Sequence, residues 1–240
     1  MITTLFFDIG ETILDAGPQM DALMEVHRNV LEDFGFPISQ DEYRQLDDAM
    51  TRSFVPSAMH AITWHFANPD KGLYDDITRK IRSQYDEIRQ IESRLYPGVD
   101  RLLEMLANDF TLGLAGNAPA SVLKSLDGFG VLRWFTHTDI SGSIGIKKPD
   151  QQFFETILAN ADTKASEAVM IGDRLDNDII PAKRIGMKTI WIRWGRYSIM
   201  EPRTPDDIPD ATVADVRELP NAITSVTTTD SNTKSSGSRR

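Results

Sequence analysis

The regular alternation of strand and helix patterns after residue 96 restricts the fold of this chain more than any other feature. Short apolar runs typical of buried strands occur at residues 110–115, 136–140, 168–171, 188–192 and 211–214. Helical patterns lie between them, at residues 99–107, 120–126, 151–160 and 177–185. Such alternation predicts a parallel sheet covered by helices on both faces. The sequence therefore favours an α/β fold with a doubly wound, Rossmann-like parallel-sheet core.

One further strand pattern opens the chain, far from the others. Residues 3–9 are continuously apolar around Leu5, Phe6 and Phe7, as in a strand buried on both faces. The segment 16–95 that follows contains helical patterns only, which begin near Pro18 and then cover residues 41–54, 58–66 and 72–91. Because the first strand has no sheet partner before this segment ends, we expect it to join the later sheet. The predicted organisation is an α/β core at 1–15 and 96–222, an inserted all-α cap at 16–95 and a disordered polar tail at 223–240.

The overall charge and composition restrict the possible partners. The chain has 26 basic and 36 acidic residues, a formal charge of −10, which argues against nucleic acid and anionic membranes as partners. A small phosphorylated substrate remains compatible, since the local charge of a pocket can oppose the global sign. The absence of cysteine excludes disulfides and thiolate metal sites. No apolar run reaches the roughly 20 residues that span a bilayer, and the first 15 residues lack the pattern of a signal peptide. We expect a cytoplasmic protein whose oligomeric state the sequence leaves open.

Polar clusters follow four of the predicted strands. They are Asp8, Gly116-Asn117, Lys147-Lys148-Pro149-Asp150, and Gly172-Asp173 with the nearby Asp176 and Asp178. Each cluster alone has an ordinary structural interpretation, because Asp often caps helices and acidic residues favour a first helical turn. In an open parallel sheet, however, ligands bind outside the carboxyl ends of the strands. The joint occurrence of the clusters at that edge favours one functional site.

The order and spacing of these clusters resemble the haloacid dehalogenase superfamily, in the subclass with a helical cap after the first strand. The resemblance rests on LFFDIGETILD, YPGV, LGLAGN, GIKKPDQQFF and VMIGDRLDNDIIPAKRIGM, and with the cap it covers the chain up to about residue 220. The last of these stretches is the most specific. The resemblance implies a Mg²⁺-dependent, phosphatase-like hydrolase of a small phosphorylated metabolite, working through an aspartyl-phosphate intermediate.

The resemblance also implies individual roles. Asp8 is expected to be the nucleophile. Lys148, with Lys147 as the alternative, is expected to hold the nucleophile and the negative charge of the substrate. Gly116 and Asn117 are expected to bind the phosphate group. The expected Mg²⁺ ligands are Asp8, the backbone carbonyl of Gly10, Asp173 and Asp178, and such oxygen ligands are those Mg²⁺ prefers.

Three positions depart from the pattern of the superfamily, and one of them is Glu11, where Gly is usual. Gly10 stands where a second Asp usually acts as general acid and base, and Gly116 stands where Ser or Thr usually binds the transferred group. The substrate is therefore expected to carry a good leaving group, such as an acyl phosphate, a phosphoanhydride or a halide, unless Glu11 or a cap residue replaces the acid. Two alternative functions stay open: a dehalogenase-type hydrolase that attacks carbon, and a non-catalytic binding protein with this fold.

Overall fold

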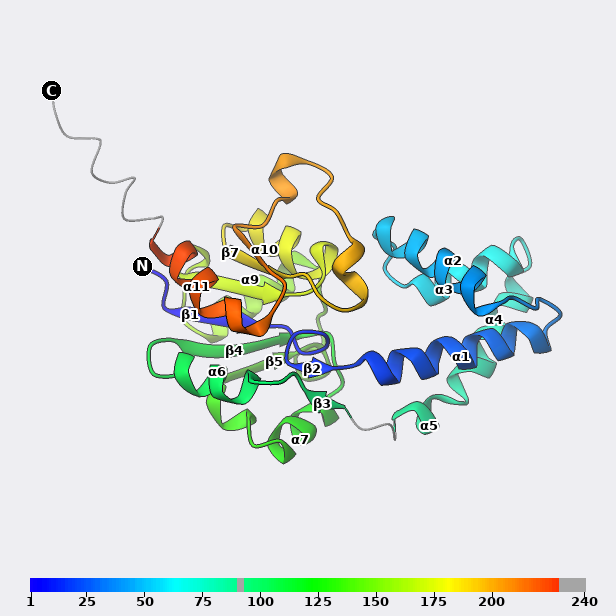
Figure 1. Ribbon diagram of the computed structural model, residues 1–240, viewed down its shortest axis with the longest axis horizontal. Helices are drawn as coiled ribbons and strands as arrows, with labels where there is room; N and C mark the ends of the chain where they lie inside the picture. The colour runs from blue at the N-terminus through cyan, green and yellow to red at the C-terminus, as the bar shows by residue number, and fades with distance from the viewer. Residues whose placement is uncertain (90–92, 229–240) are drawn as a thin grey trace, which may run out of the picture. The chain divides into compact units, whose positions relative to one another are not determined.

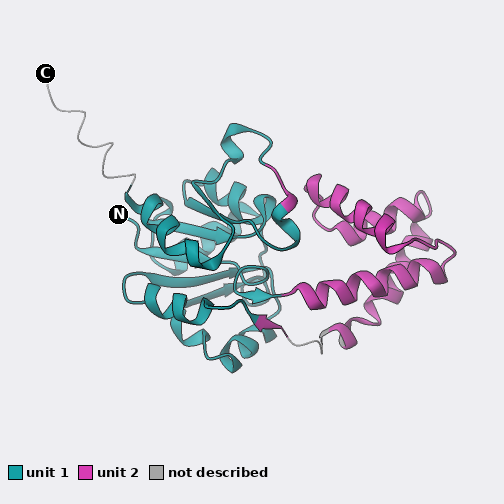
Figure 2. Ribbon diagram, in the orientation of Figure 1, with its two compact units in different colours: residues 1–15, 95–198, 202–240 teal, residues 16–94, 199–201 magenta. Residues whose placement is uncertain are grey.

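The computed structural model describes residues 1–89 and 93–228, and the chain divides into two compact units (Figures 1 and 2). Unit 1 comprises residues 1–15, 95–198 and the chain from 202 onward, and unit 2 comprises residues 16–94 and 199–201. The predicted insert, 16–95, extends one residue beyond the main segment of unit 2. The role of unit 2 as a cap stays a prediction.

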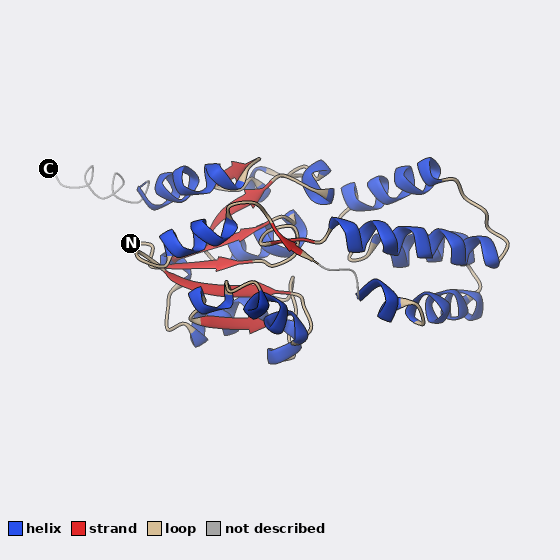
Figure 3. Cartoon of the chain, turned by 60° about the horizontal axis from the view of Figure 1, so that its bottom comes forward, coloured by secondary structure: helices blue, strands red, loops and turns tan. Residues whose placement is uncertain are grey.

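Unit 1 is built on a six-stranded parallel sheet, in the order β5-β4-β1-β6-β7-β8 (Figure 3). The strands are β1 (Thr4–Phe7), β4 (Thr111–Gly116), β5 (His137–Ile140), β6 (Ala168–Gly172), β7 (Lys188–Ile192) and β8 (Ala211–Val213). The first strand joins this sheet, as predicted, and lies between β4 and β6. The α/β fold with a doubly wound parallel sheet is confirmed. A separate two-stranded sheet, which was not predicted, pairs β2 (Leu14–Asp15) with β3 (Arg94–Leu95).

Side chains alternate along each strand, so both faces of the sheet carry apolar side chains, and helices cover both faces. Leu5 and Phe7 of β1 pack with α6 (Val99–Leu106), α7 (Ser121–Gly128) and α11 (Leu219–Thr228). Phe6 points to the other face and packs with α9 (Gln151–Asn160) and α10 (Ile180–Arg184), next to the short α8 (Ser141–Ile144). Because helices cover both faces, polar side chains collect at the ends of the strands.

Unit 2 consists of helices with an apolar core that contains one buried histidine. The helices are α1 (Gly17–Asp33), α2 (Gln40–Arg52), α3 (Ala58–Ala67), α4 (Lys71–Arg82) and α5 (Tyr85–Arg89). The ring of the fully buried His27 lies 2.7 Å from the Tyr43 hydroxyl at Nδ1 and 3.0 Å from Thr63 Oγ1 at Nε2. Because the Thr63 hydroxyl donates to the carbonyl of Met59, Nε2 carries the proton and Nδ1 accepts from Tyr43. Three helices are thus joined through a neutral imidazole.

The predicted helices differ from the observed ones at two places. The segment 72–91 forms α4 and α5 rather than one helix. The first of these ends at Arg82, and the hydroxyl of the next residue, Ser83, donates to the carbonyl of Lys80. Residues 90 and 91 lie outside the described chain. The segment 177–185 forms a π-helical turn, Leu175–Ile179, followed by α10. Pro181 has no N–H with which to continue an α-helical hydrogen-bond ladder through that turn.

The predicted disordered tail also differs in part from the structure. Residues 223–228 form the second half of α11, where Ile223 and Val226 are buried in the core of unit 1. The polar composition of the neighbouring residues concealed this short apolar face. The remaining residues of that prediction, 229–240, lie outside the described chain. Among the described residues, no helix has both the length and the apolar content that crossing a bilayer requires.

Candidate active site

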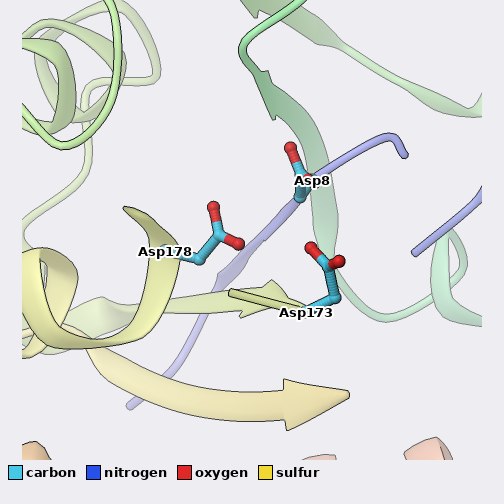
Figure 4. A group of neighbouring side chains, drawn as sticks. All are labelled: Asp8, Asp173 and Asp178. Atoms are coloured by element: carbon cyan, nitrogen blue, oxygen red, sulfur yellow. The ribbon is translucent and has the colours of Figure 1, made fainter. Parts of the chain in front are cut away.

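Three aspartates meet at the carboxyl edge of the sheet (Figure 4). Asp8 directly follows β1, and its backbone N–H donates to the carbonyl of Ile171 on β6, 2.9 Å away. Asp173 follows β6, and Asp178 belongs to the π-helical turn beyond it. Since β1 and β6 are neighbouring parallel strands with Phe7 opposite Ile171, their last residues bring the first two carboxylates side by side.

The three carboxylates are close enough to share a cation. One oxygen from each of Asp8, Asp173 and Asp178 lies within 4.8 Å of the others, and the last two residues are almost fully buried. The buried Oδ2 of Asp173 has no hydrogen-bond partner within the described parts of the chain. A buried carboxylate oxygen without a partner, beside two other carboxylates, fits a hard divalent cation.

Gly172 is required for this close approach. A Cβ atom placed on Gly172 would lie 2.6 Å from the carboxylate of Asp178, which is less than any real contact of a Cβ atom. The Oδ2 of Asp178 also accepts a hydrogen bond of 3.0 Å from the backbone N–H of Arg174. On the other side, the indole N–H of the buried Trp191 donates to the carbonyl of Asp173 at 2.8 Å. These contacts fix both aspartates relative to the sheet.

Lys148 lies between two of the aspartates. Its Nζ is 2.6 Å from Oδ1 of Asp8 and 2.5 Å from Oδ1 of Asp178, and the side chain is buried. Burial acts to lower the pKa of Lys148, but the charges of the two carboxylates outweigh it and raise the pKa above its ordinary value. The neighbouring Lys147 is exposed. The structure therefore brings Lys148, rather than Lys147, to the predicted site.

The site has an excess of negative charge. Burial, followed by the charges of Asp8 and Asp178, raises the pKa of Asp173 well above its usual value. Burial also raises the pKa of Asp178 to about 6, against the opposing effect of Lys148. Three carboxylates and one ammonium group in a buried space cannot all remain ionised without a cost in free energy. A bound cation would offset this excess.

Asn117, a predicted phosphate-binding residue, contacts the backbone of Lys148. Its amide donates to the carbonyl of Lys148 at 2.8 Å and accepts from the N–H of Lys148 at 2.9 Å, although the residue is exposed. Its side-chain amide therefore holds the backbone of the lysine. Gly116, at the end of β4, contributes no side chain, and Ile9 fills the neighbouring space: a Cβ on Gly116 would lie 2.7 Å from Cδ1 of Ile9.

In the described chain, the space around Gly10, which stands where the superfamily has its second Asp, is empty, and the carboxylate of the next residue, Glu11, contacts Tyr96 and Gly195. No atom lies within 4 Å of a Cβ placed on Gly10. Glu11 has a left-handed backbone, with φ at 54°, and its Oε2 accepts a 2.8 Å hydrogen bond from the hydroxyl of Tyr96. Burial and this hydrogen bond raise the pKa of Tyr96. The carboxylate of Glu11 also lies against Gly195.

Arg174 is a neighbour of the site that sequence reasoning did not assign. Its guanidinium lies 4.6 Å from the centre of the Tyr197 ring and pairs with Asp176, with Nη2 2.6 Å from Oδ2. Burial acts to lower the pKa of Arg174, but the hydrogen bonds that its guanidinium donates to Asp176 outweigh burial and raise the pKa. No sequence pattern signals the contact with Tyr197, because the two residues are 23 positions apart.

Comparison with known proteins finds a matching family model and similar sequences and structures. The family model described as haloacid dehalogenase-like hydrolase matches residues 5–192. The chain is 30% identical over 230 residues to glyceraldehyde 3-phosphate phosphatase of Methanopyrus kandleri, covering 91% of this chain and 96% of that protein. It is 25% identical over 223 residues to phosphoglycolate phosphatase of Vibrio parahaemolyticus, covering 88% and 92% respectively. The solved structure of 2-haloacid dehalogenase from Pseudomonas syringae is similar, with a TM-score of 0.59, 25% identity, and coverage of 93% of this chain and 99% of that one.

Proposed function

The chain belongs to the haloacid dehalogenase-like hydrolase family, and we propose that it is a Mg²⁺-dependent phosphatase of a small phosphorylated metabolite, with Asp8 as the nucleophile. The observation that carries the proposal is the contact of Lys148 with Asp8 at 2.6 Å, beside a triad of carboxylates. The phosphatase names of similar curated proteins support the reaction class. The lack of cysteine is compatible with the reducing cytoplasm, where we expect the protein to act.

The proposed chemistry uses these groups in two steps. A carboxylate oxygen of Asp8 attacks phosphorus, the bond from phosphorus to the leaving oxygen breaks, and an aspartyl-phosphate results. Water then attacks phosphorus, releases inorganic phosphate and restores the carboxylate. Lys148 orients Asp8 and offsets the negative charge that gathers when the phosphoryl group arrives. Asn117 keeps the lysine in place through its backbone.

Four groups are proposed to hold the metal ion: Asp8, the backbone carbonyl of Gly10, Asp173 and Asp178. The unpartnered Oδ2 of Asp173 supports their fit to a cation. A bound Mg²⁺ would reduce the repulsion between the anionic nucleophile and the anionic substrate.

The leaving group of the proposed substrate is a good one. Neither Gly10 nor Gly116 has a polar side chain, and the carboxylate of Glu11 is bonded to Tyr96. General acid assistance is worth about 10²- to 10⁴-fold, so substrates that expel a poor alkoxide lose most from its absence. Acyl and aryl phosphates should therefore be hydrolysed faster than alkyl phosphates.

The direct test compares the unaltered protein with Asp8→Asn. Phosphate release is measured from an acyl phosphate, an aryl phosphate and several sugar phosphates, with Mg²⁺ and with a chelator. Turnover that needs Mg²⁺, is lost in Asp8→Asn and persists in Asp127→Asn, an exposed residue of α7, supports the proposal. Absence of release from every substrate would contradict it, and release of halide from a haloacid would then favour the dehalogenase alternative.

A further inference from the structure

We propose that Glu11 is a positioning residue which, through Tyr96, sets the direction of the Gly10 carbonyl toward the metal site; the inference rests on the proposed function. The observation behind it is a long-range contact. The Oε2 of Glu11 accepts a hydrogen bond of 2.8 Å from the hydroxyl of Tyr96, 85 positions along the chain. Both residues belong to unit 1.

The backbone of Glu11 has a conformation that side chains disfavour. Its φ of 54° is left-handed, a region that costs an L-residue roughly 1 kcal/mol. The turn around it is tight, because its N–H donates to the carbonyl of Leu14, and the N–H groups of Ile13 and Leu14 both donate to the carbonyl of Ile9. Such a conformation persists where the surrounding contacts hold it. These backbone hydrogen bonds contribute, and the hydrogen bond from Tyr96 adds a tertiary contact to them.

The direction of the Gly10 carbonyl depends on this conformation. The carbonyl of Gly10 and the N–H of Glu11 belong to one planar peptide unit. Rotation about the N–Cα bond of Glu11, which is its φ angle, turns that plane relative to the rest of the residue. A side chain held at its carboxylate end therefore restricts the orientation of the carbonyl that precedes it.

The carboxylate of Glu11 also lies against Gly195, and further contacts anchor its partner Tyr96. Gly195 lies so close that a Cβ on it would collide with Oε2 of Glu11, and its own φ is 64°. The ring of Tyr96 packs against that of Trp194, with centroids 5.2 Å apart, and the N–H of Tyr96 donates to the carbonyl of Ile13 at 3.1 Å. The carboxylate thus meets the loop after β7 and the chain that returns from unit 2, and both are anchored to unit 1. In this arrangement the carboxylate of Glu11 is a fixed hydrogen-bond acceptor rather than a proton donor.

The test measures Mg²⁺ binding directly, by titration calorimetry on the full chain, beside turnover of an aryl phosphate. Glu11→Ala and Tyr96→Phe should each weaken Mg²⁺ binding by about tenfold, the low end of the loss when outer partners of metal ligands are removed. Glu11→Gln keeps an acceptor oxygen and should bind within about twofold of the unaltered protein. The double variant Glu11→Ala/Tyr96→Phe should bind no more weakly than Glu11→Ala, since both changes remove one contact.

The outcomes separate this inference from the proposed function. Equal Mg²⁺ affinity in Tyr96→Phe and the unaltered protein would overturn the inference while leaving the phosphatase proposal in place. Loss of turnover in Glu11→Gln at unchanged Mg²⁺ affinity would also overturn it, in favour of acid catalysis by Glu11. If the unaltered protein binds no Mg²⁺, the proposed function fails and the inference fails with it. Circular dichroism checks the folding of each variant. If Glu11→Ala does not fold, Tyr96→Phe, which removes only one oxygen atom, still tests the inference.

Discussion

The side-chain amide of Asn117 holds the backbone of Lys148 at both of its polar groups, with hydrogen bonds of 2.8 and 2.9 Å. The contact joins the loop after β4 to the lysine that lies between Asp8 and Asp178. An amide is the side chain that offers a donor and an acceptor side by side, as this backbone needs. The placement of the ammonium group thus depends on the contact of Asn117 with the backbone of Lys148.

Replacement of Asn117 should therefore impair turnover more than stability. In Asn117→Ala we expect kcat for an aryl phosphate to fall by about tenfold or more, because a small displacement of a catalytic group is costly. The loss in free energy of unfolding should be about 1 kcal/mol, since the residue is exposed. Asn108→Ala is a matched control, because the Asn108 amide also bonds backbone carbonyls but lies after α6. An equal kcat in Asn117→Ala and Asn108→Ala would contradict this role.

Acid should destabilise the protein through His27. Burial, with a smaller effect of His60, lowers the pKa of His27 from 6.5 to about 4. Between these values the unfolded chain binds a proton that the folded chain does not, so the stabilisation present above pH 6.5 is lost as the pH falls toward 4. The loss in free energy of unfolding should be roughly 3 kcal/mol. Denaturant unfolding between pH 4 and 7 measures it.

The His27 contribution can be isolated with two variants. His27→Gln stays neutral throughout this range and should lack that part of the pH dependence. His65→Gln, which changes an exposed histidine of the same unit, should keep it. If the free energy of unfolding depends on pH in His27→Gln as it does in the unaltered protein, this explanation is wrong.

Introduction of an acid at Gly10 should widen the range of leaving groups. The position has open space around it and a φ outside the left-handed region, so Gly10→Asp fits without backbone strain. We expect turnover of alkyl phosphates to rise by about tenfold or more relative to aryl phosphates, because the new carboxyl can protonate a poor leaving group. Gly10→Asn supplies the same volume without the acid. If the ratio of alkyl to aryl turnover is the same in both variants, leaving-group quality is not what Gly10 determines.

Changes in side-chain size at Ile9 and Gly116 should have coupled effects on the free energy of unfolding. A Cβ on Gly116 approaches Cδ1 of Ile9 to 2.7 Å, so Gly116→Ser should lower the free energy of unfolding by about 1–3 kcal/mol. Ile9→Ala creates space at the same place, and the double variant should lose less stability than the two single losses added together. Thermal or denaturant unfolding of the four proteins measures the coupling. Strict additivity would show that Ile9 does not fill the space of the missing hydroxyl group.

Local sequence patterns predicted most of the fold. The helix at 151–160 and the strand at 188–192 have the predicted bounds, because Asp150 caps the helix and the strand ends in the apolar run Ile190, Trp191 and Ile192. The errors in the predicted helices came from features that the hydrophobic periodicity of the sequence does not show. Pro181 converts the expected helix at 177–185 into a π-helical turn and a short α-helix. The polar sequence around residues 223–228 likewise concealed the short apolar face that this part of α11 buries.

The candidate site was predictable only as a set of strand-end residues. The sequence placed Asp8 and Asp173 at strand ends, and parallel pairing of β1 with β6 brings those ends together. It did not reveal that Asn117 holds Lys148 or that Glu11 meets Tyr96, because these partners are 31 and 85 positions apart. Such contacts depend on how loops fold over the sheet edge, which no local pattern encodes.

Detection of a phosphoryl group on Asp8 tests the central claim most directly. The protein is mixed with Mg²⁺ and an excess of an acyl phosphate, quenched in acid within the turnover time, digested, and examined by mass spectrometry. The account predicts that the peptide containing Asp8 gains one phosphoryl group, that the gain needs Mg²⁺, and that Asp8→Asn shows none. Substrate turnover that proceeds in Asp8→Asn, or a phosphoryl group found on another residue instead, would contradict it.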